Sequence, residues 1–372
     1  MTTRFRDLVP AYIRAIDPYR PGKPVEEVER ELGLHAIKLA SNENPLGPSP
    51  KAVEAIRRAL AEGNRYPDGG GFYLREKLAA RHGVAIEQIA LGLGSSELID
   101  LAARALLGPG LEGMTSKGTF PLYQISIRAT GAKLVEVPLL DYTFDLDALG
   151  AAITAQTRVL YIANPNNPTG TFFRAPEFAR FLDRVPAHVL VVLDEAYCDY
   201  VEDPEYSHSV EEFRRRGNLF VLRTFSKIHG LAGIRIGYGI GPADLLEELN
   251  KLRTPFNTSG VAQAAALAAL EDGEHVSRSR ESNKAGRSWV SAQLAEMGAQ
   301  FVPSATNFLF VKVGPEAEAV VHELLRLGVI VRPMGWMGFP DAFRVSVGTP
   351  EENRKFVEAF AQVRARAGSA RS

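Results

Sequence analysis

Lys227 is the residue whose neighbours most clearly indicate covalent chemistry. It lies three residues after Thr224, one residue after Ser226 and eight residues before Arg235. A lysine amine forms a Schiff base with an aldehyde, while hydroxyl groups and a guanidinium can hold a phosphate at the other end of the same molecule. The segment is therefore a candidate site for a phosphorylated aldehyde, with Lys227 as the group that makes the covalent link.

The same segment suggests one other chemistry. Thr224 and Lys227 have a Thr-x-x-Lys spacing that resembles the Ser-x-x-Lys nucleophile motif of penicillin-recognising enzymes. Those enzymes also carry Ser-Asp-Asn and Lys-Thr-Gly motifs, and neither motif occurs in this sequence. The acyl-transfer interpretation therefore lacks the other groups that it needs.

A second polar segment, Asp194-Glu-Ala-Tyr197, follows the apolar run Val189–Leu193. A carboxylate at the end of a buried strand is costly unless it meets a cation or a hydrogen-bond donor. A protonated pyridine nitrogen is such a cation, whereas a carboxylate that caps the next element is the structural alternative. Asp194 is therefore a candidate partner for a ring nitrogen.

A third segment, Asn164-Pro-Asn-Asn-Pro-Thr-Gly170, follows the predicted strand Val159–Ala163. Prolines on both sides restrict the backbone, so the loop can aim the amide of Asn167 at a ligand oxygen. Asparagine and proline are also typical of an ordinary turn. Their density over seven residues favours a binding loop.

The fourth segment, Gly92-Leu-Gly-Ser-Ser-Glu97, joins the predicted strand Ile89–Leu93 to a predicted helix. Backbone amides at a helix N-terminus, together with two serine hydroxyls, form a suitable anion site. A helix cap that uses Glu97 is the structural alternative. A dinucleotide-binding fingerprint is a poorer match, because Glu97 takes the place of its third glycine.

Short apolar strands alternate with helices over this part of the sequence. This alternation predicts an α/β fold, with a three-layer large domain built on a mostly parallel sheet. Ligands bind such sheets at the carboxyl ends of the strands, and all four polar segments follow predicted strands. The further predicted elements are the strands Lys133–Val137, Leu219–Leu222 and Ile234–Ile240 and the helix Pro176–Asp183.

The sequence pattern changes after Pro255. An alanine-rich helix is predicted over Ala262–Leu270 and a long charged helix from about Glu274 to Met297, before short strands and helices alternate again. We predict an N-terminal arm over residues 1–48, a large domain over 49–255 and a smaller C-terminal α/β domain over 256–372, which the arm completes. A polar tail is expected from Arg364 to Ser372.

The composition excludes several classes of protein. A net charge of -1 over 372 residues offers no basic surface for nucleic acid or for an anionic membrane. Cys198 is the single cysteine, so no internal disulfide forms, which fits a reducing cytoplasm. No secretory signal and no apolar run of about 18 residues is found. We expect a soluble, cytoplasmic protein with small-molecule substrates and no metal.

Taken in this order, the four segments resemble the fold-type I pyridoxal-phosphate aminotransferases of class I/II. The intervals are 27 residues from Asn167 to Asp194, 33 from there to Lys227 and 8 from there to Arg235. Within this family the sequence is most similar to the histidinol-phosphate aminotransferase group. The segments that carry this closer similarity are Ser41-Asn-Glu-Asn-Pro45, Arg65-Tyr-Pro-Asp68, Thr224–Arg235 and Val329-Ile-Val-Arg-Pro-Met334.

The resemblance implies that pyridoxal 5'-phosphate is the cofactor. Lys227 is implied to hold it covalently and then to move the proton during transamination. Asp194 is implied to pair with the pyridinium nitrogen, while Asn167 and Tyr197 bond the ring oxygen. Phe120 is implied to stack on the ring. The residues that the resemblance assigns to the phosphate are Gly94, Ser95, Ser96, Thr224, Ser226 and Arg235, joined by Tyr66 from a neighbouring subunit of a homodimer.

Substrate recognition is implied to involve Tyr19, Asn167, Arg332 and Arg344. One guanidinium can bind the carboxylate of glutamate or the phosphate of histidinol phosphate. The expected reaction is therefore amino transfer between histidinol phosphate/imidazole-acetol phosphate and glutamate/2-oxoglutarate, in histidine biosynthesis. An aromatic amino-acid aminotransferase, a phosphothreonine decarboxylase and a non-catalytic pyridoxal-phosphate-binding regulator are the alternatives.

Three positions depart from the pattern of the family. Ser96 stands where an acid is common, and Gly118 stands where a proline commonly precedes Thr-Phe. Trp336 adds bulk beside the two candidate substrate arginines, and we expect it to pack under a loop. These departures leave the expected cofactor site intact and concern the choice of substrate.

Overall fold

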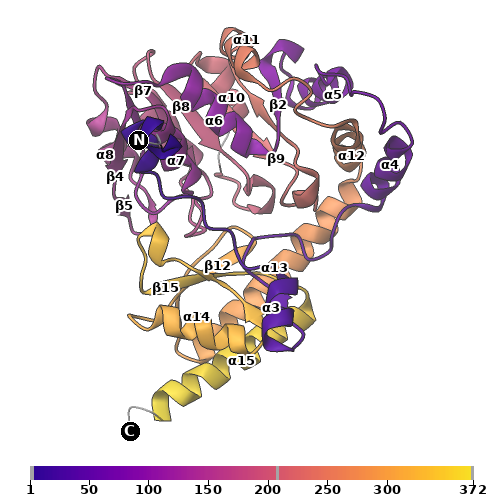
Figure 1. Cartoon of the computed structure of the whole chain (residues 1–372), viewed down its shortest axis with the longest axis vertical. Helices are drawn as coiled ribbons and strands as arrows, with labels where there is room; N and C mark the ends of the chain where they lie inside the picture. The colour runs from indigo at the N-terminus through magenta and orange to yellow at the C-terminus, as the bar shows by residue number, and fades with distance from the viewer. Residues whose placement is uncertain (1–3, 207–208, 370–372) are drawn as a thin grey trace.

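The computed structural model describes residues 4–206 and 209–369, which form a large and a small lobe (Figure 1). Within the described residues, the large lobe contains a seven-stranded sheet in the order β2-β10-β9-β8-β7-β3-β4. Strands β9, β8, β7, β3 and β4 are parallel, and β10 lies antiparallel between β2 and β9. The strands are β2 (Ile89–Gly92), β3 (Glu112–Ser116), β4 (Lys133–Val137), β7 (Thr157–Ala163), β8 (Leu190–Asp194), β9 (Leu219–Thr224) and β10 (Gly237–Ile240).

Helices cover both faces of this sheet. Every residue of β3 and β8 is buried, which requires a packed layer on each side. The predicted α/β fold with a mostly parallel sheet is therefore confirmed. The helices of the large lobe are α4 (Pro50–Leu60), α5 (Phe72–His82), α6 (Ser95–Leu106), α7 (Leu122–Ala129), α8 (Leu146–Ala152), α9 (Ala175–Leu182), α10 (Ser209–Arg215), α11 (Ala243–Leu252) and α12 (Gly260–Leu270).

The small lobe has its own sheet and its own core. Its sheet has the order β11-β12-β15-β14, and Phe343, Phe356 and Phe360 pack together in its core. The long helix α13 runs from the large lobe into the small one (Figure 1). The elements are α13 (Gly273–Glu296), β11 (Gln300–Val302), β12 (Phe308–Lys312), α14 (Ala317–Arg326), β14 (Arg332–Pro333), β15 (Ala342–Ser346) and α15 (Pro350–Ser369).

The N-terminal segment contacts both lobes. Strand β1 (Ile37–Lys38) pairs in parallel with β13 (Val329–Ile330) of the small lobe. Helix α3 (Val25–Leu32) buries Val28 in an apolar cluster that also contains Ile330. The first helices, α1 (Phe5–Leu8) and α2 (Ala11–Arg14), lie beside α7 of the large lobe (Figure 1). The segment between them and β1 therefore bridges the lobes.

The structure differs from the sequence-based expectations in four places. Strand β3 was missed because its residues, Glu-Gly-Met-Thr-Ser, are mostly not apolar. The strand expected over Ile234–Ile240 begins only at Gly237, because Arg235 has a left-handed φ of 60°. The boundary between the large and the small domain was expected at Pro255. Helix α12, which follows Pro255, still packs in the core of the large lobe, so the boundary falls later, within α13. The expected polar tail is helical through Ser369, and residues 370–372 lie outside the described part.

None of the helices in the described part of the chain is both long and apolar enough to span a membrane.

Candidate active site

A cavity of about 270 Å³ lies where the two lobes and the N-terminal segment meet. Strand β2 runs in the same direction as β9, because β10 is antiparallel to both. The carboxyl ends of β2, β7, β8 and β9 therefore face the same side, as open α/β sheets require for a shared site. The predicted site residues that line this cavity are Tyr19, Gly94, Ser95, Ser96, Phe120, Asn167, Asp194, Tyr197, Thr224, Ser226, Lys227, Arg235, Arg332 and Arg344.

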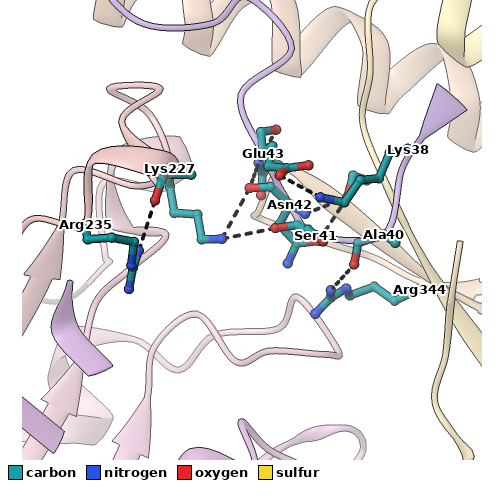
Figure 2. A network of polar contacts seen from close by, with 11 residues as sticks. Lys38, Ala40, Ser41, Asn42, Glu43, Lys227, Arg235 and Arg344 are labelled. Atoms are coloured by element: carbon teal, nitrogen blue, oxygen red, sulfur yellow. Dashed lines mark hydrogen bonds and ion pairs between the residues drawn. The ribbon is translucent and has the colours of Figure 1, made fainter. Parts of the chain in front are cut away.

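Lys227 extends from the loop after β9 toward the N-terminal segment (Figure 2). Its Nζ donates to the carbonyl oxygens of Ser41 and Asn42, each at 3.3 Å. It also lies 5.4 Å from the centroid of the Tyr197 ring. Burial, with the Arg344 guanidinium as a second cause, lowers the pKa of Lys227 from 10.5 to about 8. An amine of this kind can act as a nucleophile or a base close to neutral pH.

Asp194 ends strand β8 and is only 6% exposed. The Tyr123 hydroxyl donates to its Oδ2 at 2.8 Å, and the backbone N–H of Ala196 donates to its Oδ1 at 3.1 Å. Burial raises the pKa of the Asp194 carboxyl to about 6, although these two donors oppose the rise. Such a carboxyl has no cation among its hydrogen-bond partners and is suited to pair with a cationic ring nitrogen.

A cluster of donors forms the other end of the cavity. Thr224 Oγ1 donates to Ser226 Oγ at 3.0 Å, and Nη1 of Arg235 donates to the same oxygen at 3.3 Å. Nη2 of Arg235 also donates to the carbonyl of Leu93 at 3.1 Å. Helix α6 begins here after Gly94 without a side-chain cap, which leaves the positive end of the helix facing the cluster. Hydroxyls, a guanidinium and a helix N-terminus are the donor set of a phosphate site.

Only glycine fits at position 94, beside the donor cluster. Its φ of 71° is left-handed, and a Cβ at this position lies 2.8 Å from Nη2 of Arg235. Any side chain therefore displaces the guanidinium from the cluster. The cradle fits the phosphate of pyridoxal 5'-phosphate, while Lys227 and Asp194 fit its aldehyde and its ring nitrogen.

Arg344 lies at the opposite end, on β15 of the small lobe. Its Nη1 donates to Oδ1 of Asn167, and its Nη2 donates to the carbonyl of Ala40 at 2.8 Å. Its guanidinium stands 5.1 Å from the centroid of the Phe308 ring. Its Nε has no hydrogen-bond partner within the described residues, although it is buried. A buried, unpartnered guanidinium N–H is suited to receive an anionic oxygen of a ligand.

Arg332 lies on the neighbouring strand β14, opposite Arg344 in register. Its guanidinium contacts two rings, 5.6 Å from the centroid of Tyr19 and 5.0 Å from that of Trp336. Its Nη2 donates to the carbonyl of Arg20. Trp336 does not line the cavity. It packs against the cluster that contains Phe310 and Met334, and it contacts Arg332, which does line the cavity.

Aromatic side chains close the cavity beside the arginines. Tyr19 meets Phe120 edge-on at 6.3 Å between centroids, and Phe120 meets Tyr123 edge-on at 5.6 Å. Tyr66 is not brought to this cavity. Its side chain is 82% exposed, and its ring stacks on that of Phe256 with 4.6 Å between the centroids.

One of the departures from the family pattern, Gly118, has a physical reason. Gly118 has a φ of 81°, and a Cβ there lies 2.5 Å from the Phe339 ring, so neither proline nor any other side chain fits. His229 is buried against Phe225, burial lowers its pKa, and its Nδ1 finds no partner among the described residues.

Sequence reasoning missed two residues, Tyr123 and Asn42. Tyr123 lies in the first turn of α7 and looks like an ordinary core aromatic, so nothing in the sequence marked its bond to Asp194. Asn42 lies within a motif that the resemblance used, Ser41-Asn-Glu-Asn-Pro45, but no role was assigned to it. Its left-handed φ of 54° is not visible in the sequence.

Comparison with known proteins gives consistent results. Residues 35–360 match the family described as aminotransferase class I and II. The chain is 48% identical over 360 residues to histidinol-phosphate aminotransferase 1 of Nitrosococcus oceani, which covers 96% of this chain and 97% of that protein. It is 50% identical over 350 residues to histidinol-phosphate aminotransferase of Akkermansia muciniphila, covering 93% and 95%.

A solved structure extends this likeness to three dimensions. The crystal structure of histidinol-phosphate aminotransferase from Sinorhizobium meliloti, in complex with pyridoxal-5'-phosphate, superimposes with a TM-score of 0.88 at 31% identity. The match covers 95% of this chain and 96% of that one.

Proposed function

The chain belongs to the family of class I and II aminotransferases, and we propose that it transfers an amino group between histidinol phosphate and 2-oxoglutarate. It is a pyridoxal-phosphate-dependent enzyme. The observation that carries the substrate proposal is the pair of buried arginines, Arg332 and Arg344, in the cavity that also contains Lys227. Two guanidiniums suit a reaction whose substrates carry a phosphate or two carboxylates.

The cofactor would be held by residues at or after the ends of strands β2, β3, β7, β8 and β9. The donors of the phosphate cradle are Gly94, Ser95, Ser96, Thr224, Ser226 and Arg235. Asp194 would pair with the ring nitrogen, Asn167 and Tyr197 would hydrogen-bond the ring oxygen, and Phe120 would stack on the ring. When bound, the cofactor supplies an electron sink for the bond that is broken at the amino-bearing carbon.

Lys227 does the proton transfer in this proposal. Its pKa of about 8 leaves an appreciable unprotonated fraction near neutral pH, so Nζ can accept a proton from carbon and return it. Asp194 keeps a proton on the ring nitrogen, because a buried carboxylate is stabilised by a cation that faces it. Asp194 is buried and Lys227 is half-buried, which limits the access of water to the reacting atoms.

Arg344 and Arg332 orient the substrate. The unpartnered Nε of Arg344 supplies a donor for a carboxylate oxygen, and Arg332 supplies a second cation on the adjacent strand. Tyr19 and Phe120 provide ring edges against which an imidazole can pack.

The rings of Tyr19 and Phe120 also suit one alternative substrate. An aromatic amino acid would also find ring partners in Tyr19 and Phe120. It would leave Arg332 without a phosphate, and a buried cation without an anion is costly. Histidinol phosphate therefore uses more of the cavity than phenylalanine does.

We also propose that the enzyme works as a homodimer in which Tyr66 reaches the cofactor phosphate of the partner. Tyr66 is exposed and stacks on the exposed ring of Phe256, and exposed apolar side chains of this kind suit a subunit contact. Apart from the boundary at Pro255, which falls later in the structure, the division into arm and domains stays a prediction of the sequence, as does the cytoplasmic location.

The test is a substrate comparison with the purified, cofactor-loaded protein. Histidinol phosphate with 2-oxoglutarate should yield glutamate with a kcat/KM at least about a hundredfold above that of phenylalanine, since two charge-assisted bonds separate them. Equal or greater efficiency with phenylalanine would favour the aromatic alternative. Release of carbon dioxide from phosphothreonine without glutamate formation would instead identify a decarboxylase.

A further inference from the structure

Asn42 lies at the centre of the contact between the N-terminal segment and the site. It is 1% exposed, and Figure 2 shows it between Lys227 and Arg344. Its φ of 54° places the backbone in the left-handed region, which asparagine tolerates better than most residues other than glycine. A strained backbone inside a functional site suggests that the conformation has a purpose.

The hydrogen bonds of Asn42 fix the direction of its side-chain amide. Its backbone N–H can only donate, and it donates to Oγ of Ser346 at 2.8 Å. The Ser346 hydroxyl accepts this bond and sends its own proton to Oδ1 of Asn42 at 3.1 Å. Because Oδ1 faces Ser346, the amide NH₂ faces the other way and donates to Oη of Tyr197 at 2.9 Å.

This order of donors has a consequence for Tyr197. A phenol has one proton to donate, and the amide NH₂ of Asn42 offers no acceptor for it. The phenol proton must therefore point away from Asn42, and the Tyr197 side chain lines the cavity. We infer that Asn42 is a positioning residue that turns the Tyr197 hydroxyl proton into the cavity, toward the ring oxygen of the bound cofactor. The inference rests on the role proposed above for Tyr197.

Asn42 is itself held from both lobes. Its carbonyl accepts from Nζ of Lys227 at 3.3 Å and from Nδ2 of Asn307 at 3.0 Å. Ser346 lies two residues after Arg344 on β15, and Arg344 donates to the carbonyl of Ala40. The amide that orients Tyr197 is thus anchored to the strand that carries the substrate arginine.

The decisive variant is Asn42→Gly. Glycine keeps the left-handed backbone without strain and removes only the side chain. The readout is the pH midpoint of the visible absorbance change of the cofactor-loaded protein. This midpoint depends on how well the anionic form of the ring oxygen is stabilised, and not on the rate of turnover. A donor that faces this oxygen stabilises its anionic form and lowers the midpoint, so loss of the orientation should raise it by about one pH unit.

A double-mutant cycle with Tyr197→Phe decides whether Asn42 acts through Tyr197. Tyr197→Phe should raise the midpoint, and Asn42→Gly should raise it no further in that background. If the two shifts add, Asn42 acts by another route and the inference is overturned. If Tyr197→Phe shifts nothing, the proposed role of Tyr197 fails and the inference fails with it, while the transaminase assay still tests the proposed reaction separately.

Two further variants separate positioning from general loosening. Asn44→Ala is the matched control, since Asn44 is a buried asparagine of the same segment whose amide donates to Ile228 O at 2.8 Å and to Ser279 Oγ at 2.9 Å. It should leave the midpoint in place. Ser346→Ala removes the hydroxyl that fixes the Asn42 amide and should also raise the midpoint. It therefore tests the inference even if Asn42→Gly folds poorly. A shift in Asn44→Ala equal to that in Asn42→Gly, or none in Ser346→Ala, would refute the inference.

Discussion

Tyr123 holds Asp194 by a hydrogen bond of 2.8 Å from its hydroxyl to Oδ2. Both side chains are buried, and the backbone N–H of Ala196 occupies the other carboxylate oxygen. The carboxyl is therefore fixed in the position where a cationic ring nitrogen can meet it. Its ionised form depends on these two donors, because burial alone disfavours the charge.

Tyr123→Phe should raise the pKa of Asp194 further above its present value of about 6. The hydroxyl stabilises the ionised form, and a bond to a charged group contributes about 1.5 kcal/mol or more, or about one pKa unit. Carboxyl NMR of the protein without cofactor measures the shift. Tyr161→Phe is the control, because Tyr161 is equally buried but donates to the carbonyl of Ile99. An unchanged Asp194 pKa in Tyr123→Phe would contradict the prediction.

Lys227 should destabilise the protein when no cofactor is bound. Its folded pKa of about 8 lies below the ordinary 10.5, so near pH 7 the charged amine is held at a cost. Between pH 8 and 10.5 the unfolded chain binds more protons than the folded one, and stability therefore rises with pH. Lys227→Met should raise the free energy of unfolding at pH 7 by about 2 kcal/mol, with the gain lost above about pH 10.

Urea unfolding of the cofactor-free protein at pH 7 and pH 10 checks this prediction. Lys117→Met, at an exposed position, controls for the change of residue type. A loss of stability in Lys227→Met at pH 7 would mean that the amine is well solvated or paired in the folded state.

The sequence predicted the strand ends well, because buried parallel strands are apolar runs followed directly by polar residues. Asp194 and Lys227 could be found in this way, since each follows such a run. Strand β3 could not, because Glu112 within it is a buried charge stabilised by Lys133 and Thr154 from other segments. The roles of Tyr123 and Asn42 also depend on partners 71 and 155 residues away, Asp194 and Tyr197, which no local pattern encodes.

Gly94→Ala should weaken cofactor binding selectively. The added Cβ lies 2.8 Å from Nη2 of Arg235 and must displace that guanidinium from the phosphate cradle. We expect the Kd for pyridoxal 5'-phosphate to rise about tenfold or more, since one charge-assisted bond is weakened. Fluorescence titration of the cofactor-free protein measures it. Gly108→Ala lies just beyond the other end of α6, where a Cβ meets nothing within 4 Å, and should leave Kd unchanged.

Arg332→Lys should impair the phosphate-bearing substrate more than the cofactor. A lysine cannot reproduce the planar guanidinium that contacts both Tyr19 and Trp336, nor its paired donors. We expect kcat/KM for histidinol phosphate to fall roughly 10- to 100-fold, while the cofactor Kd stays the same. Trp336→Leu should cause a smaller, several-fold loss, because it removes one cation–π contact only. An equal loss with phenylalanine as substrate would argue against a phosphate contact.

Mixed dimers should reveal whether Tyr66 acts across the subunit contact. Tyr66→Ala and Lys227→Ala homodimers should each have little activity, because every site lacks one of the two groups. In a mixed dimer, one site has both an intact Lys227 and an intact Tyr66 from the other subunit. Refolding the two variants together in equal amounts should restore roughly a quarter of the wild-type activity, as random pairing requires. If Tyr66 served its own subunit, the activity of the mixture would stay at the average of the two variants, and the shared site would be excluded.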